Sequence, residues 1–182
     1  MPTPNPTGEV QLAFAWTTWL KPFSHNLHRL WLAIDIKMDI LVTDRRLAIV
    51  WTTNPYNSMF PFNLVDVFFY APHVGPWREQ AAAGNIDDAL LTPLRKEVFP
   101  VGTITSVTLS SEKFAANDCV LVINLKDGVS RSYATNLGFH PADPAKAKEF
   151  AALPFEKKFG EIERRHGDFV AALHRFNEFC GK

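Results

Sequence analysis

The sequence lacks the patterns that several large classes of protein require. It has two cysteines, Cys119 and Cys180, which are too few for a disulfide framework or a zinc site. Lysine plus arginine equals aspartate plus glutamate at 19 each, so the net charge is +0 and the basic surface that nucleic-acid binding needs is missing. We therefore predict a protein that binds no nucleic acid and works in a reducing, cytoplasmic compartment.

Long hydrophobic runs are also missing. The longest, Leu30–Ile36 and Leu64–Ala71, each contain an aspartate and fall far short of the ~20 residues that cross a bilayer. Residues 1–9 have neither the positive region nor the apolar stretch of a signal peptide. These absences predict a protein that is not exported and not integral to a membrane, and they leave peripheral membrane contact open.

Short catalytic motifs are absent as well. The sequence has no Gly-x-Ser-x-Gly, no Cys-x-x-Cys and no glycine-rich phosphate loop. Its adjacent carboxylates Asp87 and Asp88 precede an apolar run, which favours a helix start over acid–base catalysis. We therefore predict that the chain is not an enzyme, although distant residues can assemble a catalytic site that no motif reveals.

Metal-ligand patterns are incomplete. His25 and His28 could share a face of a helical turn, but no carboxylate or cysteine ligand stands near them. Glu163 and His166 have the Glu-x-x-His spacing that di-iron bundles use twice, and a second copy is missing. No metal and no cofactor are expected.

Aromatic residues are abundant instead. The 182 residues include 15 Phe and 5 Trp, within an ordinary globular composition of 47% hydrophobic and 21% charged residues. This length fits one domain with a substantial core. Large rings pack both cores and interfaces, so some of these rings are candidates for a partner surface.

Apolar patterns of period two predict a strand-rich α+β domain. Val10–Trp19 is typical of a first strand, and Leu30–Trp51 of two strands joined by the polar turn Thr43–Arg46. Asp127-Gly128 between two β-type runs is a strong hairpin signal, because both turn positions need positive φ. Further strands are predicted over residues 62–70, 103–109, 119–125 and 130–135. Residues 1–8 are rich in proline and are expected to be disordered or extended.

The C-terminal region changes to helical periodicity. A short helix is expected from Pro144, capped by Asp143, to Leu153. Apolar positions then alternate in steps of four and three, which predicts a helix that packs on the sheet or, less favoured, forms a coiled-coil seam with another chain. The stripe comprises Phe155, Phe159, Ile162, His166, Phe169, Leu173, Phe176 and Cys180.

Residues 55–97 interrupt the strand pattern. Pro72, Gly75 and Pro76 punctuate this segment, and the residues after them predict one short helix within irregular chain. We interpret the segment as an insertion that lies over the sheet. Its aromatic and methionine residues suit an apolar contact or a pocket wall, and the alternative is that they form a second small core. The candidate interaction surface comprises Tyr56, Met59, Phe60, Phe62, Phe68 and Tyr70, together with Phe169, Leu173 and Phe176 of the last helix.

The order of these elements resembles the bacterial pleckstrin-homology-like (PH-like) domains, which are related to the GRAM domains. The resemblance rests on the strand-turn-strand segment 40–50 around Thr43-Asp44-Arg45-Arg46, on 99–107, on 120–128 and on the terminal helix, and it covers residues 36–52 and 98–180. It implies a bent, nearly orthogonal pair of antiparallel sheets capped by the last helix. Binding of lipid headgroups, a trait of some members, and self-assembly are the functions it implies.

Two arginines after the predicted turn form the candidate ligand site. Arg45 and Arg46 could clamp a phosphate or a partner carboxylate, with Lys21 and His28 as further cationic donors. The favoured interpretation is that an arginine pairs with Asp44 or another acid while its stem covers the edge of the core.

The first hypothesis is therefore a non-enzymatic interaction module that binds a protein partner or itself as a homo-oligomer. The neutral charge, the helical stripe and the surplus of aromatic residues motivate it. The second hypothesis is a pocket for a small ligand or a lipid headgroup, built from Arg45, Arg46 and the rings of residues 56–70. An enzyme of unrecognised type is a third and less favoured possibility.

Overall fold

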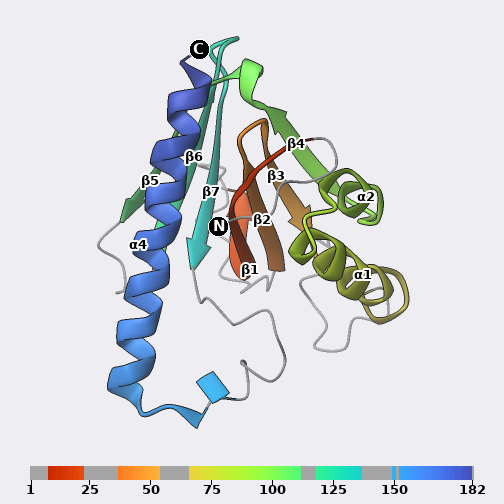
Figure 1. The fold of residues 1–182 in the computed structure, drawn as a ribbon, viewed down its shortest axis with the longest axis vertical. Coiled ribbons are helices and arrows are strands. Elements are labelled where there is room, and N and C mark those ends of the chain that lie inside the picture. Colours follow the sequence, from red (N-terminus) through yellow and green to blue (C-terminus); the bar gives the residue numbers. More distant parts are fainter. Residues whose placement is uncertain are drawn as a thin grey trace, which may run out of the picture.

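The structure is a computed structural model and describes residues 8–22, 37–53, 66–111, 118–136, 149–150 and 152–181. It has the α+β composition that the sequence predicts, with antiparallel strands followed by a long C-terminal helix (Figure 1). The strands are β1 Gln11–Pro22, β2 Lys37–Thr43, β3 Arg46–Trp51, β4 Lys96–Pro100, β5 Ile104–Ser111, β6 Asp118–Leu125 and β7 Ser130–Asn136. The helices are η2 Asp66–Tyr70, α1 Ala71–Ala82, α2 Ile86–Leu91, η3 Val101–Thr103 and α4 Phe155–Cys180.

The seven strands are hydrogen-bonded in the order β4-β3-β2-β1-β7-β6-β5, and every neighbouring pair is antiparallel. Strand β1 belongs to two antiparallel sheets. It pairs with β2 from Gln11 to Trp19, with two register irregularities, and its end pairs with β7 over Trp19–Pro22. Such irregularities bend a strand and increase its twist. Strand β1 therefore carries the chain from one sheet into the other.

The two sheets meet again across the interior. Tyr133 on β7 donates a hydrogen bond from its hydroxyl to the carboxylate of Glu97 on β4, although three strands separate β7 from β4 in the order. Burial, the bond to Glu97 and the negative charge of Glu97 together raise the pKa of Tyr133. The bond thus joins the edge of the first sheet to the second sheet.

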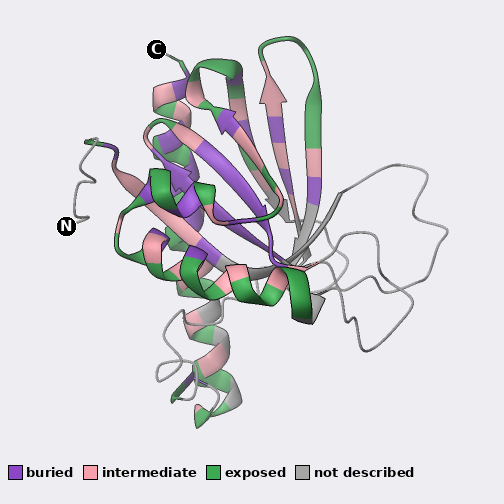
Figure 2. Cartoon of the chain, turned by 90° about the vertical axis from the view of Figure 1, so that its right-hand side faces the viewer, coloured by how far each residue is buried: buried purple, intermediate pink, exposed green. Residues whose placement is uncertain are grey.

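Strands β2 and β3 are covered on both faces. Ile40 and Ile49 point into a core shared with α4, whereas Leu41 and Val50 point into a second core built with α1 and α2. Figure 1 shows α4 on one side of the strands and α1 with α2 on the other, and Figure 2 shows buried residues running along the central strands. Burial on both faces explains why residues 40–42 and 47–51 are apolar without interruption.

The last helix packs within the subunit. Phe169, Leu173, Phe176 and Cys180 are buried in the core between α4 and the strands. This packing corrects the assignment of Phe169, Leu173 and Phe176 to an interaction surface, because reaching them would require opening the core. The side chains of Phe155, Phe159 and Ile162 lie outside the described residues.

The region before β4 differs from the prediction. The strand expected over residues 62–70 is wrong at its end, where Asp66–Tyr70 forms a helical turn that continues into α1; residues 62–65 lie outside the described residues. Helix α1 tolerates Pro72 in its first turn, where the missing N–H has no intrahelical partner, and it also contains Pro76. Burial of Trp77 and Ala81 against the sheet offsets these weak helix formers.

Strand β4 was not expected either, since the sequence placed Lys96 and Glu97 within the insertion. The strand forms because it pairs with β3 along its whole length and because Phe99 enters the α4 core. Two predicted turns match the structure: Asp44 and Arg45 connect β2 to β3, and Gly128 has φ +85° in the β6–β7 hairpin. Of the expected short helix, Asp143 and Pro144 lie outside the described residues.

Candidate functional site

The four cationic residues proposed as one ligand site do not share a place in the described structure. Arg45 and Arg46 lie at the β2–β3 turn, beside the start of β1. Lys21 is paired with Ala134 near the other end of β1, about 30 Å along the strand at ~3.3 Å per residue. His28 lies outside the described residues. The ligand site expected from the sequence is thus reduced to the turn itself.

Thr43 organises this turn. Its Oγ1 accepts hydrogen bonds from the backbone N–H of Arg45 at 3.2 Å and of Arg46 at 3.0 Å. The same hydroxyl donates to Glu9 Oε1 at 2.5 Å, with the carbonyl oxygen of Arg46 at 3.0 Å as a second acceptor. A threonine at the end of a strand therefore fixes both the turn and the position of Glu9.

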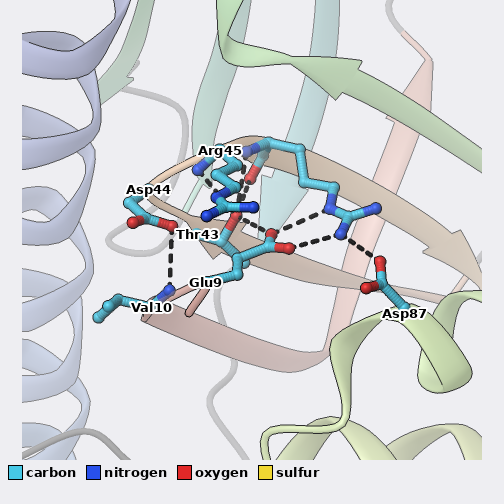
Figure 3. Close-up of polar contacts among 7 residues, drawn as sticks. Glu9, Val10, Thr43, Asp44, Arg45 and Asp87 are labelled. Carbon is cyan, nitrogen blue, oxygen red and sulfur yellow. Dashed lines mark hydrogen bonds and ion pairs between the residues drawn. The ribbon is translucent and has the colours of Figure 1, made fainter. Parts of the chain in front are cut away.

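Glu9 and Arg46 form a two-point ion pair. Arg46 Nε donates to Glu9 Oε1 at 2.9 Å and Nη2 donates to Oε2 at 2.5 Å, and Nη2 also contacts the carboxylate of Asp87 at the start of α2. The guanidinium of Arg46 therefore bridges the carboxylates of Glu9 and Asp87, which are labelled in Figure 3. The side chain of Glu9 has 0% exposure and that of Arg46 24%. We call Glu9, Thr43, Arg46 and Asp87 the Glu9 clasp.

The pKa values of the Glu9 clasp follow from this geometry. Burial alone would raise the pKa of Glu9, but hydrogen bonds from Arg46 and Thr43 and the positive charge of Arg46 outweigh burial and lower it. The hydrogen bond to Glu9 is the main reason that the pKa of Arg46 is raised, against the opposing effect of burial, with Asp87 adding to the rise. Both groups are therefore held in their charged forms.

The backbone beside Glu9 is tied to the same turn. The N–H of Val10 donates to Asp44 Oδ1 at 3.0 Å, and the N–H of Asp44 donates to the carbonyl oxygen of Val10 at 3.0 Å (Figure 3). Together with the Glu9 clasp, these bonds join residues 9–10, the turn and helix α2. The turn is thus bonded both to residues 9–10 and to helix α2. The Nε and Nη2 groups of Arg46 already donate to Glu9 and Asp87.

A second buried polar contact joins α1 to the sheet. Asp39 on β2 has 0% side-chain exposure and accepts hydrogen bonds from Arg78 Nε and Nη2, each at 2.8 Å, and from Trp77 Nε1 at 2.9 Å. The sequence analysis missed this contact. Its signal was an aspartate inside an apolar strand, since a buried carboxylate requires donors.

The polar side chains of the Glu9 clasp are occupied by one another. The hydroxyl of Thr43 is buried and donates to Glu9, and both carboxylates of the clasp face Arg46. Within the residues that the structure describes, no group of three or more histidine, cysteine, aspartate or glutamate residues is placed to hold a metal ion. Glu163 is exposed and His166 is half-buried on α4, and His25 lies outside the described residues.

The insertion exposes several large apolar side chains, which we call its surface, and borders a small recess. Of the candidate rings, Phe68 is 67% exposed and Tyr70 is half-buried, whereas Tyr56, Met59, Phe60 and Phe62 lie outside the described residues. Phe69, Leu91 and Leu94 are exposed as well. A recess of about 10 Å³, room for a single water, adjoins this surface. Its lining includes Trp51, Thr52, Tyr70, His73, Trp77 and Leu94.

Comparisons with protein-family models, curated proteins and solved structures gave no match. The fold therefore defines this protein only as an α+β protein in which two antiparallel sheets are followed by a C-terminal helix. Across the described ranges, no helix is both long enough and apolar enough to span a bilayer.

Proposed function

We propose that this chain is a non-enzymatic interaction module of the PH-like type, which binds a protein through the surface of its insertion. The PH-like assignment is supported by the seven antiparallel strands, by the sharing of β1 between two sheets and by α4 packed over the core. The partner that binds this surface is either another protein or a second copy of this chain, and photocrosslinking distinguishes the two.

The exposed apolar residues carry this proposal. In the described part of the chain, five large hydrophobic residues are exposed, and four of them belong to the insertion: Phe68, Phe69, Leu91 and Leu94. Single exposed apolar residues are ordinary, but a group of them is typical of a contact surface. Covering roughly 200 Å² of apolar area contributes about 5 kcal/mol before the costs of association, so burial by a partner is favoured.

The contacts beneath the surface support the same role. Asp39 holds α1 through Trp77 and Arg78, and Arg46 holds α2 through Asp87. The two helices are thus anchored from below while their outer apolar side chains stay exposed. Anchored elements present a preformed surface, which reduces the ordering cost of binding.

The alternative, a site for phosphate or a lipid headgroup at Arg45 and Arg46, has weaker support. Arg46 is occupied by Glu9 and Asp87, and Lys21 lies toward the far end of β1. A ligand that prefers the native state must raise the melting temperature. Inositol phosphates or anionic vesicles are therefore expected to leave the melting temperature unchanged.

A photocrosslinking amino acid tests the interaction surface. Benzoylphenylalanine is placed at Phe69 in the full chain, and at Val129 as the control, since Val129 is exposed in the β6–β7 hairpin. In cells we expect one discrete adduct from position 69 and none from position 129, and the purified protein gives the same adduct only if the occupant is a second copy. A mass of twice the chain identifies a second copy, and any other discrete mass identifies a different protein.

A substitution supplies the second half of the test. Leu91 is 79% exposed, so Leu91→Ser should change the free energy of unfolding by less than about 0.5 kcal/mol while abolishing the adduct from position 69. Equal adducts from positions 69 and 129, or an adduct that survives Leu91→Ser, would show that the insertion is not a specific binding surface.

A further inference from the structure

Strand β5 is an edge of the sheet that carries neither charge nor proline. The strand order leaves two edges, β4 and β5. Strand β4 carries Lys96, Glu97 and Pro100, residue types that discourage the addition of another strand. Strand β5 reads ITSVTLSS, with no charged residue and no proline. An uncharged edge strand of this length is a template for pairing with a further strand.

A side chain of helix α4 satisfies the outward-facing backbone groups of β5 at one position, Val107. The N–H of Val107 donates to Asn177 Oδ1 at 2.7 Å, and Asn177 Nδ2 donates to the carbonyl oxygen of Val107 at 2.7 Å. A primary amide offers the same donor and acceptor as one residue of a strand, so Asn177 takes the place of a missing neighbour at Val107. Outward-facing backbone groups recur at every second residue of an antiparallel strand. Leu109 and Ser111 therefore face the same outer side as Val107.

The end of β5 extends past the helix. Figure 1 shows α4 crossing β5 and the C-terminal end of β5 emerging on the outer side. Thr108 is exposed on the solvent face of this stretch, and Leu109 is half-buried against the core. Residues 108–111 thus form an edge segment with two outward-facing backbone positions.

We propose that residues 108–111 of β5 pair antiparallel with the same segment of a second copy of the chain. A two-fold axis at Ser110 places Leu109 of one copy opposite Ser111 of the other, so the two outward-facing backbone positions satisfy each other, and any charged side chain at the axis would meet a like charge. Strand β5 has none, and the net charge of the chain is +0, so repulsion between copies is minimal. This interface lies on β5 and is independent of the binding surface proposed for the insertion.

A pair of lysine variants of the full chain tests the interface by sedimentation equilibrium. Ser110→Lys puts two positive charges together at the two-fold axis, whereas Val129→Lys adds the same charge at the exposed β6–β7 hairpin. We expect a reversible dimer for the wild type and for Val129→Lys, and a dimer weakened at least about tenfold for Ser110→Lys. A wild type that stays monomeric up to roughly 1 mM, or equal behaviour of the two variants, would overturn the proposal.

Amide hydrogen exchange locates the interface. In the wild type, exchange at Leu109 and Ser111 should slow as the protein concentration rises. Asn177→Ala exposes the outward groups of Val107 and should tighten the dimer, whereas Leu91→Ser on the insertion should leave the protection of Leu109 unchanged. Association that slows exchange elsewhere but not at Leu109, or that Leu91→Ser removes, would assign the dimer to another surface and exclude β5.

Discussion

The carboxylate of Asp39 on β2 is held by the guanidinium of Arg78 on α1 through two hydrogen bonds of 2.8 Å each. The side chain of Asp39 has 0% exposure and that of Arg78 has 20%, so the pair lies at the boundary between the second core and solvent. Trp77 Nε1 adds a third donor at 2.9 Å. This contact thus anchors helix α1 of the insertion on the sheet.

Breaking this pair should be costly. Asp39→Ala leaves Arg78 and the indole N–H of Trp77 without their carboxylate, and removal of one partner of a buried pair costs about 3–5 kcal/mol. Urea denaturation measures the loss. The control is Arg164→Ala, which removes exposed pairs with Glu161 and Asp168 on α4 and should cost far less, because solvent screens such pairs. Similar losses for both variants would contradict the anchoring role of Asp39.

The lowered pKa of Glu9 predicts a loss of stability in acid. Because the pKa of Glu9 in the folded chain lies below its ordinary value of 4.5, the ion pair with Arg46 stabilises the fold above that pH. Its contribution disappears as the pH falls through the lowered pKa. Glu9→Gln should therefore reduce the melting temperature of the full chain at pH 7. At pH 3, the difference in melting temperature between Glu9→Gln and the wild type should be smaller. A difference independent of pH would show that the charge of Glu9 does not matter.

Removing the hydroxyl of Tyr133 should weaken the contact between the sheets. Tyr133 is 3% exposed, and Tyr133→Phe leaves the Glu97 carboxylate without this donor, which should cost about 1–3 kcal/mol in chemical denaturation. Burial raises the pKa of Tyr133, so the folded state favours the protonated phenol and loses stability as the pH rises above the ordinary value of 10.0. This alkaline loss should be smaller in Tyr133→Phe, and an unchanged profile would count against the contact.

An alanine in place of Gly167 on helix α4 should increase the stability of the protein. Gly167 is exposed in the interior of the helix, and a Cβ there would meet no atom within 4 Å. Gly167→Ala should therefore stabilise the protein by about 1 kcal/mol, which a shift of the urea midpoint would reveal. Gly128→Ala provides the opposite case, because the φ of +85° at Gly128 strains any L side chain. A destabilising Gly167→Ala would mean that the exposed face of α4 contacts something.

The sequence does not identify the partners of candidate-site residues when those partners lie far away in the chain. The sequence predicts that one of Arg45 and Arg46 pairs with Asp44 or another acid. Arg46 pairs with two other acids, Glu9 and Asp87, which are 37 and 41 residues away. Asp44 bonds to the backbone of Val10 instead. No local pattern contains such pairings, because the path of β1 and the insertion brings the partners together.

The sequence by itself determined the elements whose signals are local. The apolar stripe set α4 at Phe155–Cys180, the Asp127-Gly128 pair set the β6–β7 hairpin, and apolar runs on either side of the turn at Asp44 set β2 and β3. The reason is that helical and strand periodicity depends on residues within one or two turns of each other. Only the tertiary structure decided the rest. Trp77 donates a hydrogen bond to Asp39, and helix α1 forms although it contains Pro76. Strand β4 forms by pairing with β3, and Asn177 bonds to the backbone of Val107 at the sheet edge. Those features depend on contacts between segments far apart in the chain. Such contacts stabilise the fold only when the two sheets, the insertion and the last helix are packed together.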